Sequence, residues 1–341
     1  MADDSEADIL HPRENSGLVG HAEAEQLLLD SYRSGRMPHA WLIGGPRGIG
    51  KATLAYRLAR FVLANPDPAA PAVQQANSLS VEPDNPVARR IANEAHSDLL
   101  ALERTLNDKG KLRQDIAVED VRRSVSFFGS TAGEGGWRIA IVDAVDELND
   151  FGANSLLKIL EEPPHRSLLL LISHAPGQIL PTIRSRTRRL LLRPLAQSEV
   201  AQAAAGALGR PADAEILEAA AAGEGSVARA ISLMDGSTLA LRQKVLAALD
   251  QLPNPDPRAL HALGDALSGV ESAPLATFTN IVNGWLESQL QNGNAPKPRL
   301  ARLASAWERV NAAASDADEY NLDRRPLVFS VFGLLAEAAR G

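Results

Sequence analysis

The residues whose types and spacing could do chemistry begin at Gly45. The stretch Gly45–Lys51 reads GPRGIGK and matches G-x-x-x-x-G-K, the spacing of a phosphate-binding loop. Glycines in such a loop let backbone N–H groups close on phosphate oxygens, the helix that follows adds partial positive charge, and the lysine reaches the outer phosphates. The candidate nucleotide-binding residues of this motif are Gly45, Pro46, Arg47, Gly48, Ile49, Gly50, Lys51, Ala52 and Thr53.

The position after the lysine departs from the pattern. Ala52 stands where a serine or threonine hydroxyl should hold Mg²⁺. Thr53 is adjacent, but one step along a helix turns a side chain by about 100 degrees, so its hydroxyl should face elsewhere. The motif therefore predicts a site of nucleotide-binding ancestry, with a chance glycine-rich turn as the alternative. Hydrolysis is a separate question.

A second candidate, Asp143, ends the apolar run of WRIAIVD. An acid at the end of a buried strand, downstream of a phosphate loop, can hold water on Mg²⁺, although an ordinary strand-terminal acid is the alternative. Working ATPases of this kind need a further carboxylate beside it to activate the attacking water, and the next residue is Ala144. Asp146 and Glu147 follow, beyond the expected strand end. The sequence therefore argues against hydrolysis at this site.

Three further polar residues are candidates. Ser173 ends the apolar run LLLLIS, where its hydroxyl can sense phosphate or can simply be a satisfied strand-end group. Arg186 lies in a cluster of arginines. An arginine at a domain edge can stabilise phosphoryl transfer in a neighbouring subunit. The alternative is that the cluster is simply a basic, solvent-exposed edge. Arg229 is placed in the first turn of a predicted helix and can read nucleotide from a second domain. The stretch NSLLKILEEPP is by composition an amphipathic helix with a solvated acidic end.

The elements that position these residues alternate between strand and helix. Short apolar runs predict strands, and stretches with helical spacing lie between them. This alternation predicts a doubly wound α/β domain with a parallel sheet. The expected strands are Trp41–Ile43, Leu99–Leu102, Trp137–Asp143, Leu168–Ser173 and Leu190–Leu192, and the expected helices are Val19–Arg33, Ala52–Leu63, Ile116–Phe128 and Asn149–Leu160. The stretch Asn65–Asn85, rich in Pro, Ala and Gln, reads as a partly flexible insert with few core residues.

Beyond Pro194 the strand signal ends and helical spacing continues to the end of the chain. Three short helices are followed by a separate all-α bundle. The three short helices are expected at Gln197–Ala205, Asp213–Ala222 and Ser226–Met234, and those of the bundle at Leu239–Leu249, Pro257–Leu267, Ala276–Gln291, Arg299–Asp316 and Arg325–Ala339.

Bulk composition limits the class of protein. The 341 residues are 45% hydrophobic and 23% charged, which is ordinary for a globular protein. A formal net charge of −7 argues against a protein that coats nucleic acid on its own. The acidic N-terminus is unlike a signal peptide, and no apolar run approaches the roughly 20 residues that span a bilayer. With no cysteine and no ligand spacing among the seven histidines, we expect a cytoplasmic protein without a membrane partner and without a metal site made of protein ligands alone.

Taken together, five stretches resemble bacterial clamp-loader subunits of the AAA+ superfamily. They are GGPRGIGKAT, WRIAIVD, ANSLLKILEEPP, LPTIRSR and GSVARAI, and NLDRRPLVFSVF resembles the last helix of that family. The resemblance implies a RecA-like AAA+ P-loop domain with a parallel sheet, a small helical lid domain and a C-terminal helical collar domain. We place a flexible tail at 1–17, the P-loop domain at 18–193 with an insert at about 65–98, the lid at 194–236 and the collar at 237–341.

The resemblance also implies roles. The family's serine-arginine-cysteine motif supplies an arginine finger to the adjacent subunit's ATP site, and it maps onto Ser185, Arg186 and Thr187, with threonine in place of cysteine. Relatives often carry four zinc-binding cysteines in the insert, and residues 64–98 have none, so no zinc is expected. Ala52 and Ala144 fit the family's rigid stator, which does not itself hydrolyse ATP, although ATP or ADP with Mg²⁺ can still bind.

The partners implied are the gamma/tau-like motor subunits, the delta subunit, the sliding clamp and, through the complex, primed DNA. Two other functions stay open. An active ATPase motor of the same ring would use Lys51, Asp143 and Arg229. A P-loop phosphotransferase would want a hydroxyl at position 52 and a lid over a small substrate.

Overall fold

The computed structural model describes residues 10–106, 113, 115–129, 133, 136–234, 236–268, 272–291, 297–320 and 322–339. The chain divides into two compact units, Met1–Ile231 and Ser232–Gly341. The first unit holds a parallel sheet with helices, and the described part of the second is helical. The predicted fold class, α/β followed by all-α, is confirmed. The finer division of the first unit into a P-loop domain and a lid stays a prediction.

Five parallel strands form the sheet, in the order β2-β3-β4-β1-β5. The strands are β1 (Ala40–Gly44), β2 (Leu99–Glu103), β3 (Arg138–Asp143), β4 (Ser167–Ser173) and β5 (Arg188–Leu191). The apolar runs of β1 and β4 are buried along their whole length, because parallel sheets are covered on both faces. Successive side chains of β1 serve opposite faces: Trp41 packs into one hydrophobic core and Leu42 into the other.

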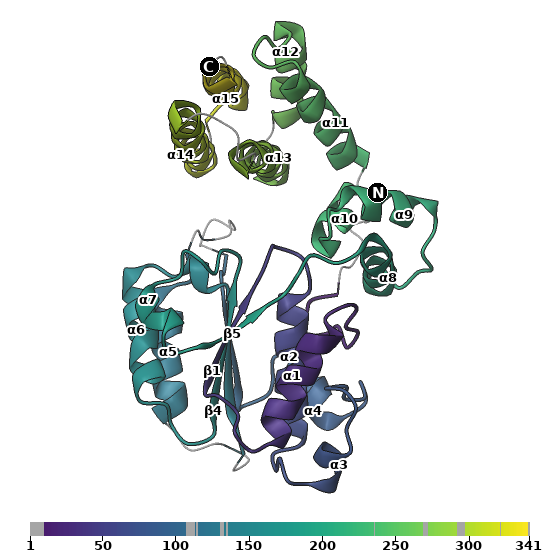
Figure 1. The fold of residues 1–341 in the computed structure, drawn as a ribbon, viewed down its shortest axis with the longest axis vertical. Helices are drawn as coiled ribbons and strands as arrows, with labels where there is room; N and C mark the ends of the chain where they lie inside the picture. The colour runs from purple at the N-terminus through teal and green to yellow at the C-terminus, as the bar shows by residue number, and fades with distance from the viewer. Residues whose placement is uncertain are drawn as a thin grey trace. The chain divides into compact units, whose positions relative to one another are not determined.

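Helices cover both faces of this sheet (Figure 1). On one side lie α1 (Ala22–Arg33) and α2 (Lys51–Ala64) with the short helices α3 (Pro71–Gln74) and α4 (Pro86–Ala92), and on the other α5 (Val118–Gly129), α6 (Asp150–Glu161) and α7 (Pro181–Arg184). A 3₁₀ turn, η1 (Val145–Glu147), follows β3. Because parallel strands all end at the same edge of the sheet, the residues that follow β1, β3 and β4 meet there.

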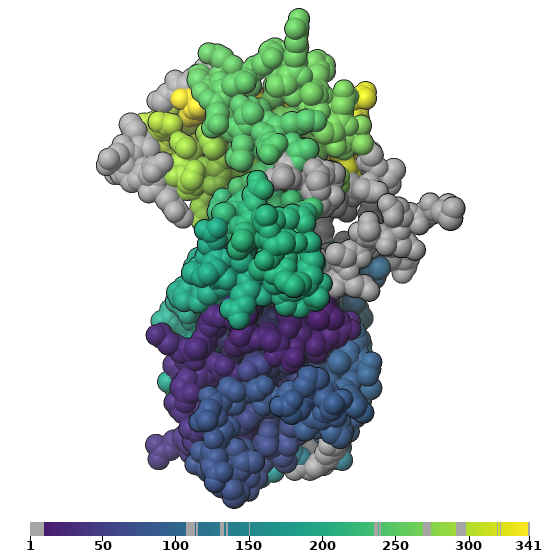
Figure 2. All heavy atoms as spheres, turned by 90° about the vertical axis from the view of Figure 1, so that its right-hand side faces the viewer, coloured from purple at the N-terminus to yellow at the C-terminus, as the bar shows by residue number. Residues whose placement is uncertain are grey.

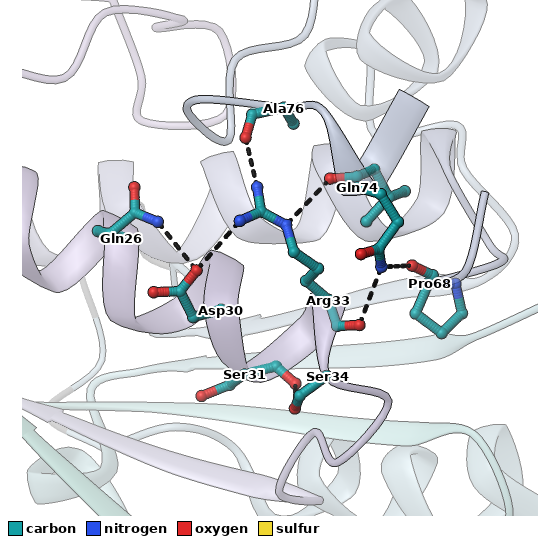
Figure 3. Close-up of polar contacts among 9 residues, drawn as sticks. Gln26, Asp30, Ser31, Arg33, Ser34, Pro68, Gln74 and Ala76 are labelled. Atoms are coloured by element: carbon teal, nitrogen blue, oxygen red, sulfur yellow. Dashed lines mark hydrogen bonds and ion pairs between the residues drawn. The ribbon is translucent and has the colours of Figure 1, made fainter. Parts of the chain in front are cut away.

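The insert that the sequence predicts as partly flexible is anchored to the first unit. Val73 and Leu79 are fully buried, and Figure 2 shows the insert (blue) lying against the N-terminal residues (purple). Arg33 at the end of α1 donates to the carbonyls of Val73 and Ala76, and Gln74 donates back to the Arg33 carbonyl at 3.1 Å (Figure 3). Arg33, which makes two of these three bonds, belongs to α1, so the insert's own composition does not reveal its contacts.

The remaining helices follow the sequence prediction closely. In the first unit these are α8 (Gln197–Ala207) and α9 (Ala214–Ala222), and α10 (Val227–Leu233) begins there and runs into the second unit. The bundle comprises α11 (Gly236–Asp250), α12 (Pro257–Leu267), α13 (Ser272–Gln291), α14 (Lys297–Glu319) and α15 (Arg324–Ala339). Its core includes Phe278 and Phe332, and Asn283 and Asn311 exchange two amide hydrogen bonds between α13 and α14. Over the described residues, no helix combines the length and apolar character that crossing a membrane requires.

Candidate nucleotide site and arginine edge

The glycine loop connects the end of β1 to the start of α2, as the motif predicts. Lys51 opens α2, and its side chain is almost fully buried, with 3% exposure. Its Nζ donates hydrogen bonds to the carbonyls of Gly45 at 2.7 Å and Pro46 at 2.5 Å. Burial lowers the pKa of this ammonium to about 8, and the charges of Asp143 and Asp146 act in the opposite direction. The Lys51 ammonium therefore binds two backbone carbonyls of its own loop.

The loop also touches the N-terminal end of α10 directly. The backbone N–H of Val227 donates to the Gly48 carbonyl at 2.8 Å. Gly48 has a φ of 73°, and a β-carbon there would lie 2.3 Å from Ser226 Oγ and 2.7 Å from the Ala228 β-carbon. Only glycine satisfies both the left-handed backbone and this close approach.

Asp143 lies at the end of β3, beside the loop. Burial raises the pKa of its carboxyl to about 6, with Glu147 acting in the same direction and Lys51 opposing. Ala144, the next residue, is buried and has only a methyl side chain, so its position offers no group that could accept a proton.

Asp146, the first carboxylate after Ala144, is engaged by the end of β4. Its Oδ1 accepts a hydrogen bond from Ser173 Oγ at 2.8 Å, and its Oδ2 accepts one from the His174 backbone N–H at 2.6 Å. A longer bond from the Ala175 N–H, 3.3 Å, also reaches Oδ1. Both oxygens are therefore occupied by neighbouring donors.

Glu147, the second carboxylate, lies between two arginines. Its Oε1 pairs with Arg47 of the loop, and its Oε2 lies 2.8 Å from Arg104 Nε, just after β2. Its side chain is only 13% exposed, while that of Arg47 is largely in solvent. The sequence could not place Asp146 and Glu147, and the structure assigns both to contacts within the protein.

A cavity of about 620 Å³ opens beside the loop. A volume of this size suits a small-molecule or cofactor site. From the predicted nucleotide-binding set, the lining includes Gly48, Ile49, Gly50, Lys51, Ala52, Thr53 and Asp143. The other predicted residues lie outside the lining. Of these, Ser173 donates to Asp146, and Arg229 pairs with Glu224 at 2.8 Å.

Two parts of the cavity wall were not among the predicted site residues. Residues 10, 12 and 14–19, placed within or next to the predicted tail, line it, because Arg60 on α2 donates to the carbonyls of Pro12 and Asn15 at 3.0 and 2.7 Å. Residues 1–9 of that tail fall outside the described residues. His174 also lines the cavity, as a neutral imidazole, since burial, then the charges of Lys51 and Arg47, lower its pKa to about 3. No local sequence signal marks the wall residues of the tail, which are held through their main chain.

A second histidine supports the loop from behind. His21 is buried just before α1, and its Nε2 lies 2.7 Å from the Ile49 carbonyl. Burial lowers the pKa of His21, so the imidazole is neutral near pH 7 and donates to this carbonyl through a protonated Nε2.

Arg186 lies away from this cavity, between α7 and β5. Its Nη1 donates to the Thr182 carbonyl at 2.9 Å, and its Nη2 lies 3.1 Å from Glu161 Oε1 at the end of α6. The side chain is 37% exposed. Its neighbours in the cluster have other contacts: the Arg188 guanidinium stacks over Trp41, and Arg193 pairs with Glu199.

The family model described as DNA polymerase III, delta subunit, matches residues 20–196, a little over half of the chain. The DNA polymerase III subunit delta' of Pseudomonas aeruginosa is 37% identical over 148 residues, 43% of this chain and 41% of that protein. Subunit tau of Bacillus subtilis is 28% identical over 290 residues, 84% of this chain and 45% of that protein.

The match covers most of the length of a third relative. Subunit delta' of Escherichia coli K12 is 28% identical over 294 residues, 81% of this chain and 83% of that protein. By contrast, the match spans less than half the length of the Pseudomonas and Bacillus relatives. The similarity therefore reaches both delta' and tau subunits, and the residues at the site have to distinguish them.

Proposed function

Because this chain belongs to the DNA polymerase III delta-subunit family, we propose that it acts as the delta-prime subunit of a clamp loader, a stator that does not itself hydrolyse ATP. In this role it supplies Arg186 in trans to a neighbouring ATPase subunit and helps load the sliding clamp onto primed DNA. It would be a component of the DNA polymerase III holoenzyme, and the active motor subunit of the same ring is the alternative.

The observation that carries the non-hydrolysing role is the engagement of both carboxylates after Ala144. A general base must accept a proton from the attacking water within hydrogen-bond reach. Asp146 accepts from Ser173 and the His174 backbone, and Glu147 is held by Arg47 and Arg104. Replacing the missing base with either residue would require breaking these contacts, which supports the stator over the motor.

The site nevertheless fits a nucleotide in size and in donors. The backbone of Gly48–Lys51 and the Lys51 ammonium would hold its phosphates, and the ammonium would first have to leave the carbonyls of Gly45 and Pro46. Asp143 is the one acid of the predicted set beside the loop, and Ala52 offers no hydroxyl to a metal. We propose that ATP or ADP with Mg²⁺ can bind here, without a metal-coordinating hydroxyl from position 52. A cysteine-based zinc site is ruled out by residue type.

The placement of Arg186 supports a role in trans. An arginine that stabilises phosphoryl transfer in another subunit must be exposed before assembly and absent from its own site. Arg186 meets both conditions, since it is partly exposed and does not line the cavity. The proposed partners are gamma/tau-like motor subunits, the delta subunit and the sliding clamp. A net charge of −7 favours contact with DNA through the complex and not by this chain alone. We place this complex in the cytoplasm.

The experiment that tests this proposal is steady-state ATP hydrolysis, by the purified chain alone and then with motor and delta subunits, clamp and primed DNA. We expect no turnover alone. In the complex we expect Arg186→Ala to depress DNA-stimulated turnover, because arginine fingers contribute about 10³-fold or more at the site that they serve. Arg189→Ala is the matched control, an exposed arginine of the same cluster. Robust turnover alone would favour the motor, and an unaffected Arg186→Ala complex would contradict the role in trans.

A further inference from the structure

The side chain that contacts Arg186 comes from another element, the C-terminal end of α6. Glu161, the last residue of α6, places its Oε1 3.1 Å from Arg186 Nη2. On the other side of the guanidinium, Nη1 donates to the Thr182 carbonyl at 2.9 Å and to Ser185 Oγ at 3.4 Å. One carboxylate and one turn of α7 therefore hold the arginine from two directions.

The backbone at both ends of this contact is fixed by burial. Leu160, immediately before Glu161, is buried in the same hydrophobic core as Ile183 of α7. Pro163 and Pro164 follow α6 and end it, so the carboxylate of Glu161 stands in the last turn of the helix. Because the backbone around both residues is held by the core, the ion pair reflects the fold and not a chance meeting of two mobile segments.

The contacts leave part of the guanidinium available. An arginine has five N–H donors in a rigid plane. Both hydrogens of Nη1 and one of Nη2 are used by the three contacts, so with respect to the described residues Nε–H and one Nη2–H remain for a ligand. A guanidinium held along one edge presents its other edge in a defined direction, whereas an arginine without these contacts would sample many rotamers.

We propose that Glu161 is a positioning residue for Arg186, orienting the guanidinium toward the phosphates of the neighbouring subunit's nucleotide. The inference rests on the proposed role of Arg186 in trans. The pair is exposed, with side-chain exposures of 37% and 52%, so it contributes little to folding stability. Its effect should therefore be found in the rate of the assembled complex and not in the melting of the isolated chain.

The chain offers a matched control in the adjacent residue. Glu162 is exposed and carries the same charge, and its side chain makes no ion pair or hydrogen bond with the part of the chain that the structure describes. Glu161→Gln and Glu162→Gln thus change the net charge equally while only the first removes the partner of Arg186. Glu161→Asp keeps the charge on a shorter side chain.

The test is ATP hydrolysis by the full complex with motor and delta subunits, clamp and primed DNA, measured against ATP concentration. For Glu161→Gln we expect kcat to fall by about fivefold to tenfold, from the lost orientation of one side chain, with KM nearly unchanged. Glu162→Gln should match the wild type, and Glu161→Asp should restore part of the rate. In the Arg186→Ala background, Glu161→Gln should have no further effect, because the residues act as one unit. Thermal melting of the isolated variants should coincide.

Each contrary outcome has a distinct meaning. Wild-type turnover in Glu161→Gln, with depressed turnover in Arg186→Ala, overturns the inference and leaves the proposed function standing. Faster turnover in Glu161→Gln also overturns it, since the carboxylate would then sequester the arginine. A further loss in the double variant overturns it too, because Glu161 would act independently of Arg186. If Arg186→Ala has no effect, the proposed function itself fails.

Discussion

Asp146 and Ser173 join the ends of two neighbouring strands: the Ser173 hydroxyl donates to Asp146 Oδ1 at 2.8 Å, across a sequence separation of 27 residues. The Ser173 hydroxyl, which the sequence suggests as a phosphate sensor, thus donates its hydrogen bond to a carboxylate of the turn after β3. The same carboxylate is unavailable as a base. One hydrogen bond therefore engages both the candidate phosphate sensor and one of the two carboxylates that could replace the missing base.

Removing this carboxylate should destabilise the first unit. In Asp146→Ala the buried Ser173 hydroxyl and the His174 N–H lose their acceptor, and an unsatisfied buried donor costs about 1–3 kcal/mol of unfolding free energy. Urea denaturation measures the loss. Asp84→Ala is the control, because Asp84 is highly exposed and pairs only at the surface with Arg89. Equal midpoints for the two variants would show that Asp146 has no structural role.

The close approach between the loop and α10 predicts an asymmetry between two glycines. Gly48 and Gly35 have similar positive φ values, 73° and 68°, but a β-carbon at Gly35 meets no atom within 4 Å. Backbone strain is common to both alanine variants, so the difference between them isolates the contact with Ser226 and Ala228. We expect Gly48→Ala to unfold at lower urea, by about 1–3 kcal/mol more than Gly35→Ala. Similar losses would mean that α10 moves aside freely.

The pKa of Asp143 predicts a pH dependence of stability. A folded-state pKa of about 6, above the ordinary value of 3.8, means that the folded protein takes up this proton more readily than the unfolded chain. Stability from this group is therefore full at low pH and is lost as pH rises through about 6. Lys51, with a pKa of about 8, stays mostly charged over pH 5–7 and does not reverse the sign.

The comparison that isolates this effect is Asp143→Asn, which removes the titration and keeps the size. Relative to this variant, the wild type should lose about 1 kcal/mol of unfolding free energy between pH 5 and pH 7. Chemical denaturation of both proteins at matched ionic strength gives the difference. A gap that stays constant across this interval would show that the Asp143 pKa is not raised.

Sequence patterns predicted the sheet well because its strands are continuous apolar runs. Leu168–Ser173 is β4 to within one residue, and Leu99–Leu102 lies within β2. Helices of eleven residues or more were also located, since periodicity has room to develop, but their ends were less exact: α13 begins at Ser272 where Ala276 was expected. Short elements such as α7 and α3, four residues each, carry too few positions to show a period and were missed.

The loop residues at the candidate site could also be found from sequence, but their partners could not. The Arg47–Glu147 pair spans 100 positions, and its existence depends on where β1 and β3 end in the folded sheet. The tail residues that line the cavity contribute backbone carbonyls to Arg60, and a main-chain contact leaves no trace in residue type. A sequence pattern can reveal a contact that requires a particular side chain. It cannot reveal a contact that any residue could make through its main chain.

The anchoring of the insert through main-chain oxygens opens a practical route to spectroscopy. Arg33 contacts the carbonyls of Val73 and Ala76, and of the side chains beside these points it is that of Gln74 that adds a hydrogen bond to the attachment, to the Arg33 carbonyl. Ala72 is exposed nearby, and the chain has no cysteine. Ala72→Cys would thus carry the sole thiol of the protein, to which a fluorophore or spin label attaches without a background. A reporter there would follow the insert itself, at a position outside the cavity lining and the contacts of Arg186.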